Sequence, residues 1–150
     1  MTTDDTPDGI TDATTGGYAL SLPRLRGLTA QWYAWLARHE LRFQRCTGCE
    51  QFRHIPREVC PRCGSTEWTW EPSSGKGTVF TWTTTHRSLH PAWVETPFAQ
   101  VVVELEEGPR VMTSLVDSTP DELRIGMPVQ VVYDDVTAEV TLPKFKRRAE

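Results

Sequence analysis

Long apolar runs are missing from this 150-residue sequence. No stretch approaches the roughly 20 residues that a membrane-spanning helix needs, and the chain does not open with the charged and apolar segments of a secretory signal. The sequence therefore predicts a cytoplasmic protein that makes no contact with a membrane. Its size leaves room for one or two small domains, which excludes a large multidomain enzyme.

Motifs of independent catalysis are also missing. The four histidines are scattered, and neither a HExxH nor a GxSxG pattern occurs. The segment SGKGT over residues 74–78 hints at a phosphate-binding loop, but it lacks the upstream glycine and a Ser or Thr directly after the lysine. We interpret it as a turn that enters a strand. We therefore expect no catalytic residue in this chain and no enzyme activity of its own.

An overall excess of basic charge, which favours nucleic-acid binding, is absent. The chain has 16 Lys and Arg residues against 20 Asp and Glu residues, for a net charge of −4. This charge divides into −4 for residues 1–17, +5 for 18–64, −8 for 65–143 and +3 for 144–150. An Arg-rich half and an acidic half of this kind favour docking against surfaces of opposite charge.

Only four cysteines are present, and their spacing is the strongest chemical signal in the sequence. Cys46-x-x-Cys49 and Cys60-x-x-Cys63 form two knuckles separated by ten residues, the pattern of a zinc ribbon. Four thiolates complete a tetrahedron around one Zn²⁺ and leave no position for water, so such a metal is structural. Iron or a redox-active dithiol is the alternative, and the lack of a surrounding βαβ pattern disfavours the dithiol.

Aromatic residues are concentrated in a predicted N-terminal helix. Apolar residues recur every three or four positions after Pro23, which favours a helix over residues 23–44 with this proline in its first turn. Trp32, Tyr33 and Trp35 lie on more than one face of that helix. They either pack in the protein's own core or dock into a partner protein.

From Gly77 onward the pattern is typical of β-structure. The turn Glu107-Gly108-Pro109 predicts that the second and third strands form a hairpin. A long loop after the first strand carries Trp93, which either caps the barrel or reaches a partner. Five strand-like runs predict a small β-barrel: GTVFTWTTTH, FAQVVVELEEG, PRVMTSLVD, MPVQVVYDD and TAEVTL.

Helix, ribbon and barrel in this order resemble the acyl-CoA-associated family of zinc-ribbon plus OB-fold proteins, long catalogued as a domain of unknown function. The similarity covers about residues 23–148 and rests on the two CxxC knuckles, PREVCPRCGS, SGKG, PFAQVVVELEEGPR and the closing LPKF. It implies a mainly β fold with a helix at 23–44, a rubredoxin-like zinc ribbon at 45–71, a five-stranded OB-fold barrel at 72–143 and a basic tail at 144–150. The composition of residues 1–17, mostly Thr, Asp and Gly, separately predicts a disordered linker at 1–22.

The resemblance also implies a function. Such proteins are non-catalytic subunits that stabilise a thiolase-like, lipid-transfer-protein-like aldolase or acyltransferase acting on acyl-CoA, here with steroid side-chain degradation as the expected pathway. A hot-dog-fold enoyl-CoA hydratase is a further expected partner. The family often has glycine where Glu50 stands, so we expect a change in the turn of the first knuckle but not in its ligation. One structural zinc ion is expected on Cys46, Cys49, Cys60 and Cys63.

Two other functions remain open from the sequence. An OB-fold can bind single-stranded nucleic acid, although the acidic balance of this barrel disfavours that function. The barrel could also bind acyl-CoA on its own, without a partner protein.

Overall fold

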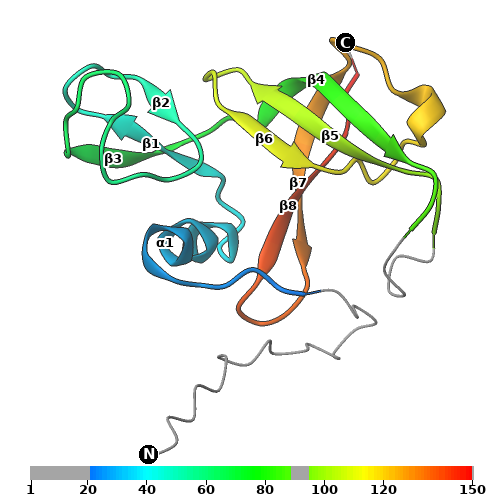
Figure 1. The fold of residues 1–150 in the computed structure, drawn as a ribbon, viewed down its shortest axis with the longest axis horizontal. Coiled ribbons are helices and arrows are strands. Elements are labelled where there is room, and N and C mark those ends of the chain that lie inside the picture. The colour runs from blue at the N-terminus through cyan, green and yellow to red at the C-terminus, as the bar shows by residue number, and fades with distance from the viewer. Residues whose placement is uncertain (1–20, 89–94, 150) are drawn as a thin grey trace, which may run out of the picture.

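The computed structural model describes residues 21–88 and 95–149 (Figure 1). The predicted linker therefore lies almost wholly outside the described residues, as does Trp93. Within the described part, no helix is long and apolar enough to cross a membrane. The elements are α1 (Gly27–Leu36), β1 (Arg42–Cys46), β2 (Phe52–Arg53), β3 (Trp68–Pro72), β4 (Lys76–Thr85), β5 (Phe98–Leu105), β6 (Arg110–Thr113), the 3-10 helix η1 (Pro120–Glu122), β7 (Pro128–Asp135) and β8 (Thr141–Arg147).

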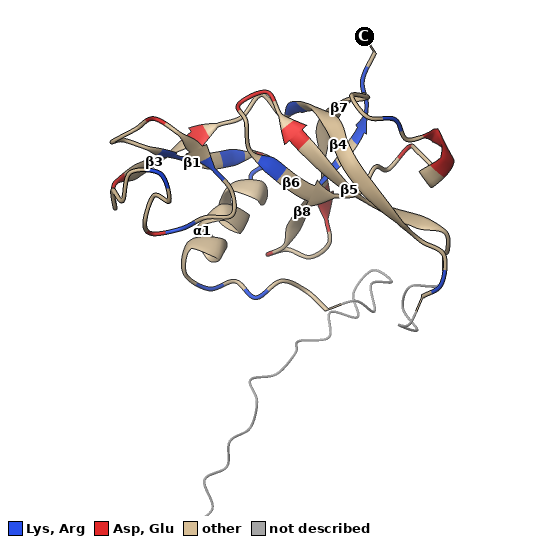
Figure 2. Ribbon diagram, turned by 45° about the horizontal axis from the view of Figure 1, so that its top comes forward, with Lys and Arg blue, Asp and Glu red and all other residues tan. Residues whose placement is uncertain are grey.

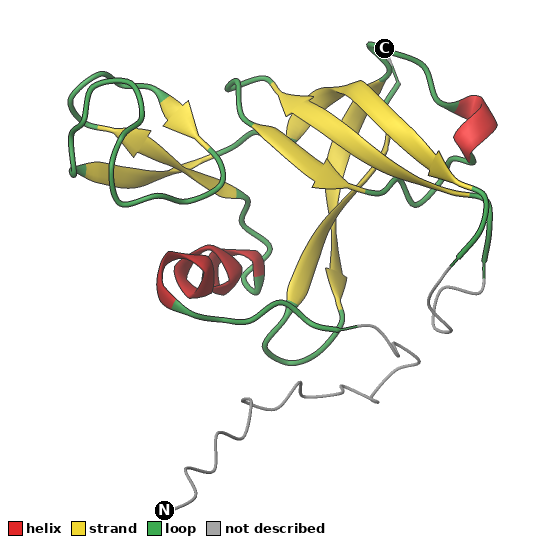
Figure 3. Ribbon diagram, in the orientation of Figure 1, coloured by secondary structure: helices red, strands yellow, loops and turns green. Residues whose placement is uncertain are grey.

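These elements confirm the predicted fold class. One short helix precedes a small three-stranded sheet, and a curled five-stranded sheet follows (Figure 3). The small sheet has the order β2-β1-β3 with antiparallel pairs. In Figure 1 it lies to one side of the barrel, with α1 below it and beside the start of β8.

Helix α1 is shorter than the predicted helix over residues 23–44. It begins at Gly27, so Pro23 precedes the helix instead of occupying its first turn. Gly27 has a φ of 54°, a left-handed conformation that favours glycine and separates the helix from the preceding chain. The prediction was wrong at both ends, because an apolar spacing of three to four residues does not by itself mark where a helix starts or stops.

A left-handed turn ends α1. His39 has a φ of 57°, and the N–H of Glu40 donates to the carbonyl of Trp35 over 3.1 Å, which closes the last turn. The chain then continues into β1, and Leu41 directly before this strand and Phe43 within it both have buried side chains. The two residues lie two positions apart, which is the period of a strand. The predicted helix over residues 23–44 is therefore wrong for this last part.

The five-stranded sheet forms the predicted OB-fold barrel. Its antiparallel order is β6-β5-β4-β7-β8, and a parallel bridge between Leu115 and Phe145 joins its two ends. The predicted hairpin is confirmed, since Glu104 of β5 pairs with Arg110 of β6 across the turn. One apolar core continues from the helix and ribbon into the barrel and includes Trp32, Leu36, Phe43, Val79, Val101, Val103, Val129 and Phe145.

Strand β8 corrects the last predicted boundaries. It starts at Thr141 and runs to Arg147, so most of the predicted basic tail at 144–150 is a barrel strand. The side chains of Thr141, Pro143 and Phe145 are buried, while the lysines between and after them face outward. This alternation was hidden by the basic residues, and the first part of TAEVTL forms the turn before the strand instead.

The SGKG segment is a tightly packed entry to the barrel, as predicted. Gly75 has a φ of 69°, and a Cβ atom at Gly77 would collide with the carbonyl oxygen of Glu104 on β5. The carboxylate of Glu107 accepts a hydrogen bond of 2.6 Å from the backbone N–H of Ser74. Because a protein carboxylate already occupies this amide, the segment serves the fold and does not form a phosphate loop.

Candidate metal centre

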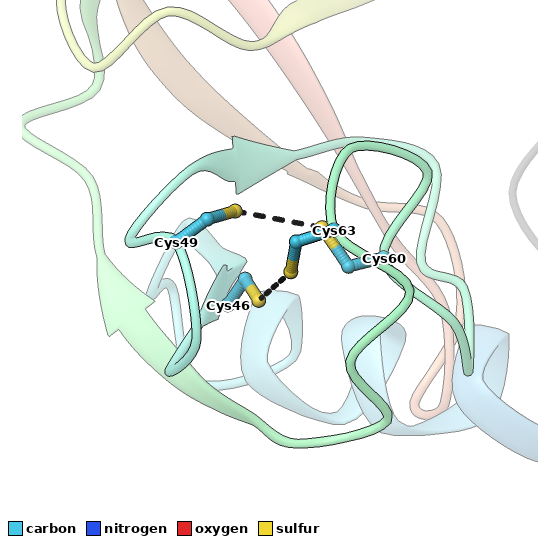
Figure 4. Close-up of side chains that lie close together, drawn as sticks. All are labelled: Cys46, Cys49, Cys60 and Cys63. Carbon is cyan, nitrogen blue, oxygen red and sulfur yellow. Dashed lines mark hydrogen bonds between the residues drawn. The ribbon is translucent and has the colours of Figure 1, made fainter.

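The four cysteines come together at one end of the ribbon (Figure 4). Cys46 ends β1, Cys49 lies in the turn after it, and the other pair lies in the loop between β2 and β3. The Sγ atoms of Cys46 and Cys63 are 3.6 Å apart, and those of Cys49 and Cys60 are 3.7 Å apart. All four sulfurs lie within 4.8 Å of one another.

This geometry fits a tetrahedral zinc ion. A Zn–S bond of about 2.3 Å gives an edge of about 3.8 Å between two sulfurs of a regular tetrahedron. The two shortest Sγ–Sγ distances lie close to that value. The four thiolates would hold one Zn²⁺ and leave no ligand position for water, so the metal would supply folding energy and no water activation.

The two knuckles have the same backbone turn. The N–H of Glu50 donates to the carbonyl of Cys46 over 2.8 Å, and the N–H of Gly64 donates to that of Cys60 over 2.9 Å. Glu50 and Gly64 are both left-handed, with φ values of 60° and 76°. Glu50 thus adopts the turn that glycine adopts in the second knuckle, and the expected change in the first knuckle does not occur.

Electrostatics within the cluster favour a cation. The backbone N–H groups of Cys49 and Gly48 donate to the Cys46 sulfur and lower its pKa to about 6. The N–H of Ser65 is the largest single influence on Cys63 and lowers its pKa, but the neighbouring sulfur of Cys46, burial and the other two thiols together outweigh it and raise the Cys63 pKa to about 11. The negative charge of one thiolate therefore disfavours ionisation of the next thiol. A divalent cation between the sulfurs would offset this repulsion and favour the ionised form of all four.

Trp32 holds the helix against the ribbon. Its side chain is only 7% exposed, and its Nε1 donates a hydrogen bond of 3.0 Å to the carbonyl of Arg42 on β1. Its ring also packs against His54, with 4.8 Å between centroids. In the described chain Trp32 therefore packs in the core, one of the two alternatives that the sequence left open, and its contact with a partner stays a prediction.

Tyr33 and Trp35 remain partly accessible on α1. The ring of Trp35 lies under two guanidinium groups, with Arg42 at 4.3 Å and Arg38 at 5.2 Å from its centroid. Tyr33 packs edge-on against Trp32 at 5.2 Å. Both residues keep surface that another protein could cover.

A hydrogen-bonded contact that the sequence did not indicate links the turn after α1 to the barrel. The Nε2 of His39 lies 2.9 Å from both carboxylate oxygens of Asp135, and its ring stacks on Tyr133 at 4.9 Å. Hydrogen bonds from Thr141 and then from His39 lower the pKa of Asp135. The partners are 96 residues apart, so no local spacing could predict them.

Two family models match consecutive parts of the chain. The model of the ChsH2 rubredoxin-like zinc ribbon domain matches residues 36–69, and that of the ChsH2 C-terminal OB-fold domain matches residues 70–134. They meet between the second knuckle and the barrel entry. The match identifies the ribbon as a zinc ribbon, in agreement with the four clustered cysteines.

Curated relatives carry two kinds of name. A DUF35 domain-containing scaffold protein of Methanothermobacter thermautotrophicus is 31% identical over 103 residues, which is 68% of this chain and 77% of that protein. A probable enoyl-CoA hydratase alpha subunit of Thermomonospora curvata is 38% identical over 83% of this chain. The 3-oxo-4,17-pregnadiene-20-carboxyl-CoA hydratase alpha subunit of Mycobacterium tuberculosis is 36% identical over 71%. The chain spans only 39% and 34% of these two subunits.

Two solved structures have a similar fold. A chain of the "Ltp2-ChsH2(DUF35) aldolase" superimposes with a TM-score of 0.76 and 36% identity, covering 84% of this chain and 98% of that one. A DUF35 protein of unknown function from Sulfolobus solfataricus superimposes with a TM-score of 0.58 over 81% of this chain and 85% of that one. At 10% identity the second likeness concerns the fold alone.

Proposed function

Because the chain belongs to the DUF35 family of ChsH2-type zinc-ribbon and OB-fold proteins, we propose that it is a non-catalytic accessory subunit. Its partner is a thiolase-like aldolase or acyltransferase that acts on acyl-CoA. The observation that carries this proposal is the likeness to a chain of the Ltp2-ChsH2(DUF35) aldolase. The two chains are 36% identical, and the present chain covers 98% of the aldolase chain. Relatives named as scaffold proteins support the same function.

The chemistry of the described residues supports a role without catalysis. The cysteine cluster is closed by its own four sulfurs, so a metal held there has no open position for a substrate or water. His54 is partly buried among aromatic rings, and His39 is hydrogen-bonded to a carboxylate. We therefore assign the bond-breaking residues to the partner, and to this chain the task of stabilising the complex.

The substrate class follows from the names of relatives and belongs to the same proposal. We assign the complex to steroid side-chain degradation, in which the partner cleaves a carbon–carbon bond of an acyl-CoA by a retro-aldol reaction. A hot-dog-fold enoyl-CoA hydratase is proposed as a further partner, since two relatives are named as hydratase alpha subunits. No hydratase activity is assigned to this chain itself.

Helix α1 is the proposed contact with the partner. Tyr33 and Trp35 keep accessible aromatic surface, and aromatic side chains dominate the binding energy of many interfaces. The helix lies beside both the ribbon and the start of β8, so a partner that covers it would contact both halves of the chain (Figure 1).

Co-purification tests the assembly. The chain, tagged and zinc-loaded, is co-expressed with a thiolase-like protein of the same organism, and the complex is isolated by size-exclusion chromatography. The proposal predicts one stable complex, which the variant Trp35→Ala weakens and the exposed-site control Arg124→Met does not. Two proteins that elute separately at micromolar concentration would contradict it.

A further inference from the structure

A groove of about 400 Å³ lies between the ribbon and the β5–β6 hairpin. We call it the interdomain groove and define it by Phe52, Arg53, His54, Arg57, Glu104 and Arg110. In Figures 1 and 2 the hairpin points toward the ribbon, and the basic start of β6 lies on that side. Junctions between domains and volumes of this size are common features of small-ligand sites.

The groove is positively charged on an acidic protein. Its charged residues are three arginines and one glutamate, a sum of +3 − 1 = +2, whereas the whole chain has a net charge of −4. The glutamate is already paired, since Arg110 Nε donates to Glu104 Oε2 over 2.7 Å. Over residues 21–88 and 95–149, neither Arg53 nor Arg57 has a carboxylate within salt-bridge distance.

Arg53 is the unusual member of this set, because it is a buried cation whose hydrogen-bond acceptors are neutral and whose guanidinium carbon lies 5.5 Å from the centroid of the Trp68 ring. Its residue is 8% exposed, its Nε donates to Gln44 Oε1 over 2.9 Å, and its Nη2 donates to the carbonyl of Arg57 over 2.8 Å. Its Nη1 is buried without any partner, and so is Nδ1 of the neighbouring His54. A buried charge of this kind is costly unless an opposite charge compensates it.

The two nearest candidates for compensation do not suffice. A water molecule could satisfy Nη1, but it would leave the positive charge uncompensated. The cysteine sulfurs accept backbone N–H groups, and no guanidinium of the described residues hydrogen-bonds to them. No group of opposite charge among the described residues therefore pairs with Arg53.

We propose that the interdomain groove binds the oxyanion of a small ligand, a phosphate or a carboxylate, between Arg57 and Arg53. The planar guanidinium group presents its N–H donors as a fork that matches both anions. Arg57 is exposed and supplies the direct contact, while Arg53 supplies fixed charge from the wall of the groove. Phe52 and the exposed Ile55, at 61% exposure, offer apolar surface to the rest of the ligand. This site goes beyond the accessory function and does not depend on it.

Anion titration of the isolated, zinc-loaded chain tests the site. Inorganic phosphate, pyrophosphate and acetate are added separately while the side-chain Nε resonances of the arginines are followed by NMR. We expect saturable shifts at Arg53 and Arg57 with at least one of these probes. Binding of the phosphates alone assigns a phosphate ligand, and binding of acetate alone assigns a carboxylate ligand.

Matched variants make the result specific. Arg57→Met should weaken binding by about tenfold, as expected for the loss of one charge-assisted contact. Arg124→Met removes the same charge from an exposed position outside the groove and should leave binding unchanged. Because Arg53→Met could unfold the ribbon, Arg53→Lys is used as well: it keeps the charge, loses the fork and should weaken binding at unchanged zinc content. No saturable shift with any probe, or equal effects of Arg57→Met and Arg124→Met, would overturn the proposal.

Discussion

The imidazole of His54 lies 4.8 Å from the indole of Trp32, between the helix and the ribbon. It also meets the ring of Phe43 edge-on at 5.6 Å. Burial lowers the pKa of His54 to about 4, from an ordinary value of 6.5, because the charged form loses its hydration in this aromatic environment. His54 is therefore neutral at neutral pH and joins three elements of the fold as an aromatic side chain.

This contact makes stability depend on acidity. Between pH 6.5 and 4 the unfolded chain binds a proton at His54 that the folded chain does not. The contribution of neutral His54 to the free energy of unfolding is therefore fully present above pH 6.5 and is lost as the pH falls to 4. The loss amounts to about 3 kcal/mol. Urea unfolding of the zinc-loaded protein at several pH values measures it. His54→Phe should remove this part of the pH dependence. If the free energy of unfolding fell equally steeply with pH in both proteins, His54 would not be its source.

Removal of the metal should unfold the ribbon before the barrel. The ribbon has short strands, β2 being only two residues long, whereas the barrel has five strands around an apolar core. Zinc binding to such sites contributes on the order of 10 kcal/mol to folding. Hydrogen exchange after treatment with a chelator should show loss of protection in β1 and β3 and retention in β4 and β5. Uniform retention in all four strands would show that the metal does not stabilise the ribbon.

Glu50 offers a position where the first knuckle can be improved. Its left-handed backbone, with a φ of 60°, costs a non-glycine residue about 1 kcal/mol that glycine does not lose. Glu50→Gly removes this cost together with an exposed ion pair to Arg45, which contributes little. Thermal unfolding and zinc competition should both show a more stable ribbon. Gly64→Ala, the opposite change in the second knuckle, should destabilise it, and a stabilising effect there would refute the explanation.

The two tryptophans of α1 should respond differently to truncation. Trp32→Ala opens a cavity in the core and should cost about 3 to 5 kcal/mol of stability. Trp35→Ala loses mainly its stacking with Arg42, about 1 kcal/mol, but should weaken the complex with the partner by about 2 kcal/mol. Urea unfolding of the isolated chain and calorimetry with the partner separate these effects. Unchanged affinity for Trp35→Ala would remove α1 from the interface.

The sequence predicted those features whose signal is local. Two CxxC pairs place four sulfurs on one metal because each knuckle is a short turn, and the alternation in β5 fixes its buried face. Distant relationships were not visible. His39 and Asp135 meet only because α1 packs beside the barrel. That Arg53 is a buried cation without an acidic partner can be seen only from the positions of its neighbours in the structure. Element ends were also poorly predicted, since the left-handed turn at His39 has no glycine to mark it.

Activity of a reconstituted complex tests the accessory role most directly. The purified, zinc-loaded chain is titrated into its thiolase-like partner while carbon–carbon bond cleavage of an acyl-CoA substrate is followed. We predict no turnover by the chain alone, and partner activity that rises to a plateau as the complex forms. Turnover by the isolated chain, or a partner whose activity and stability do not change when the chain is added, would contradict the account.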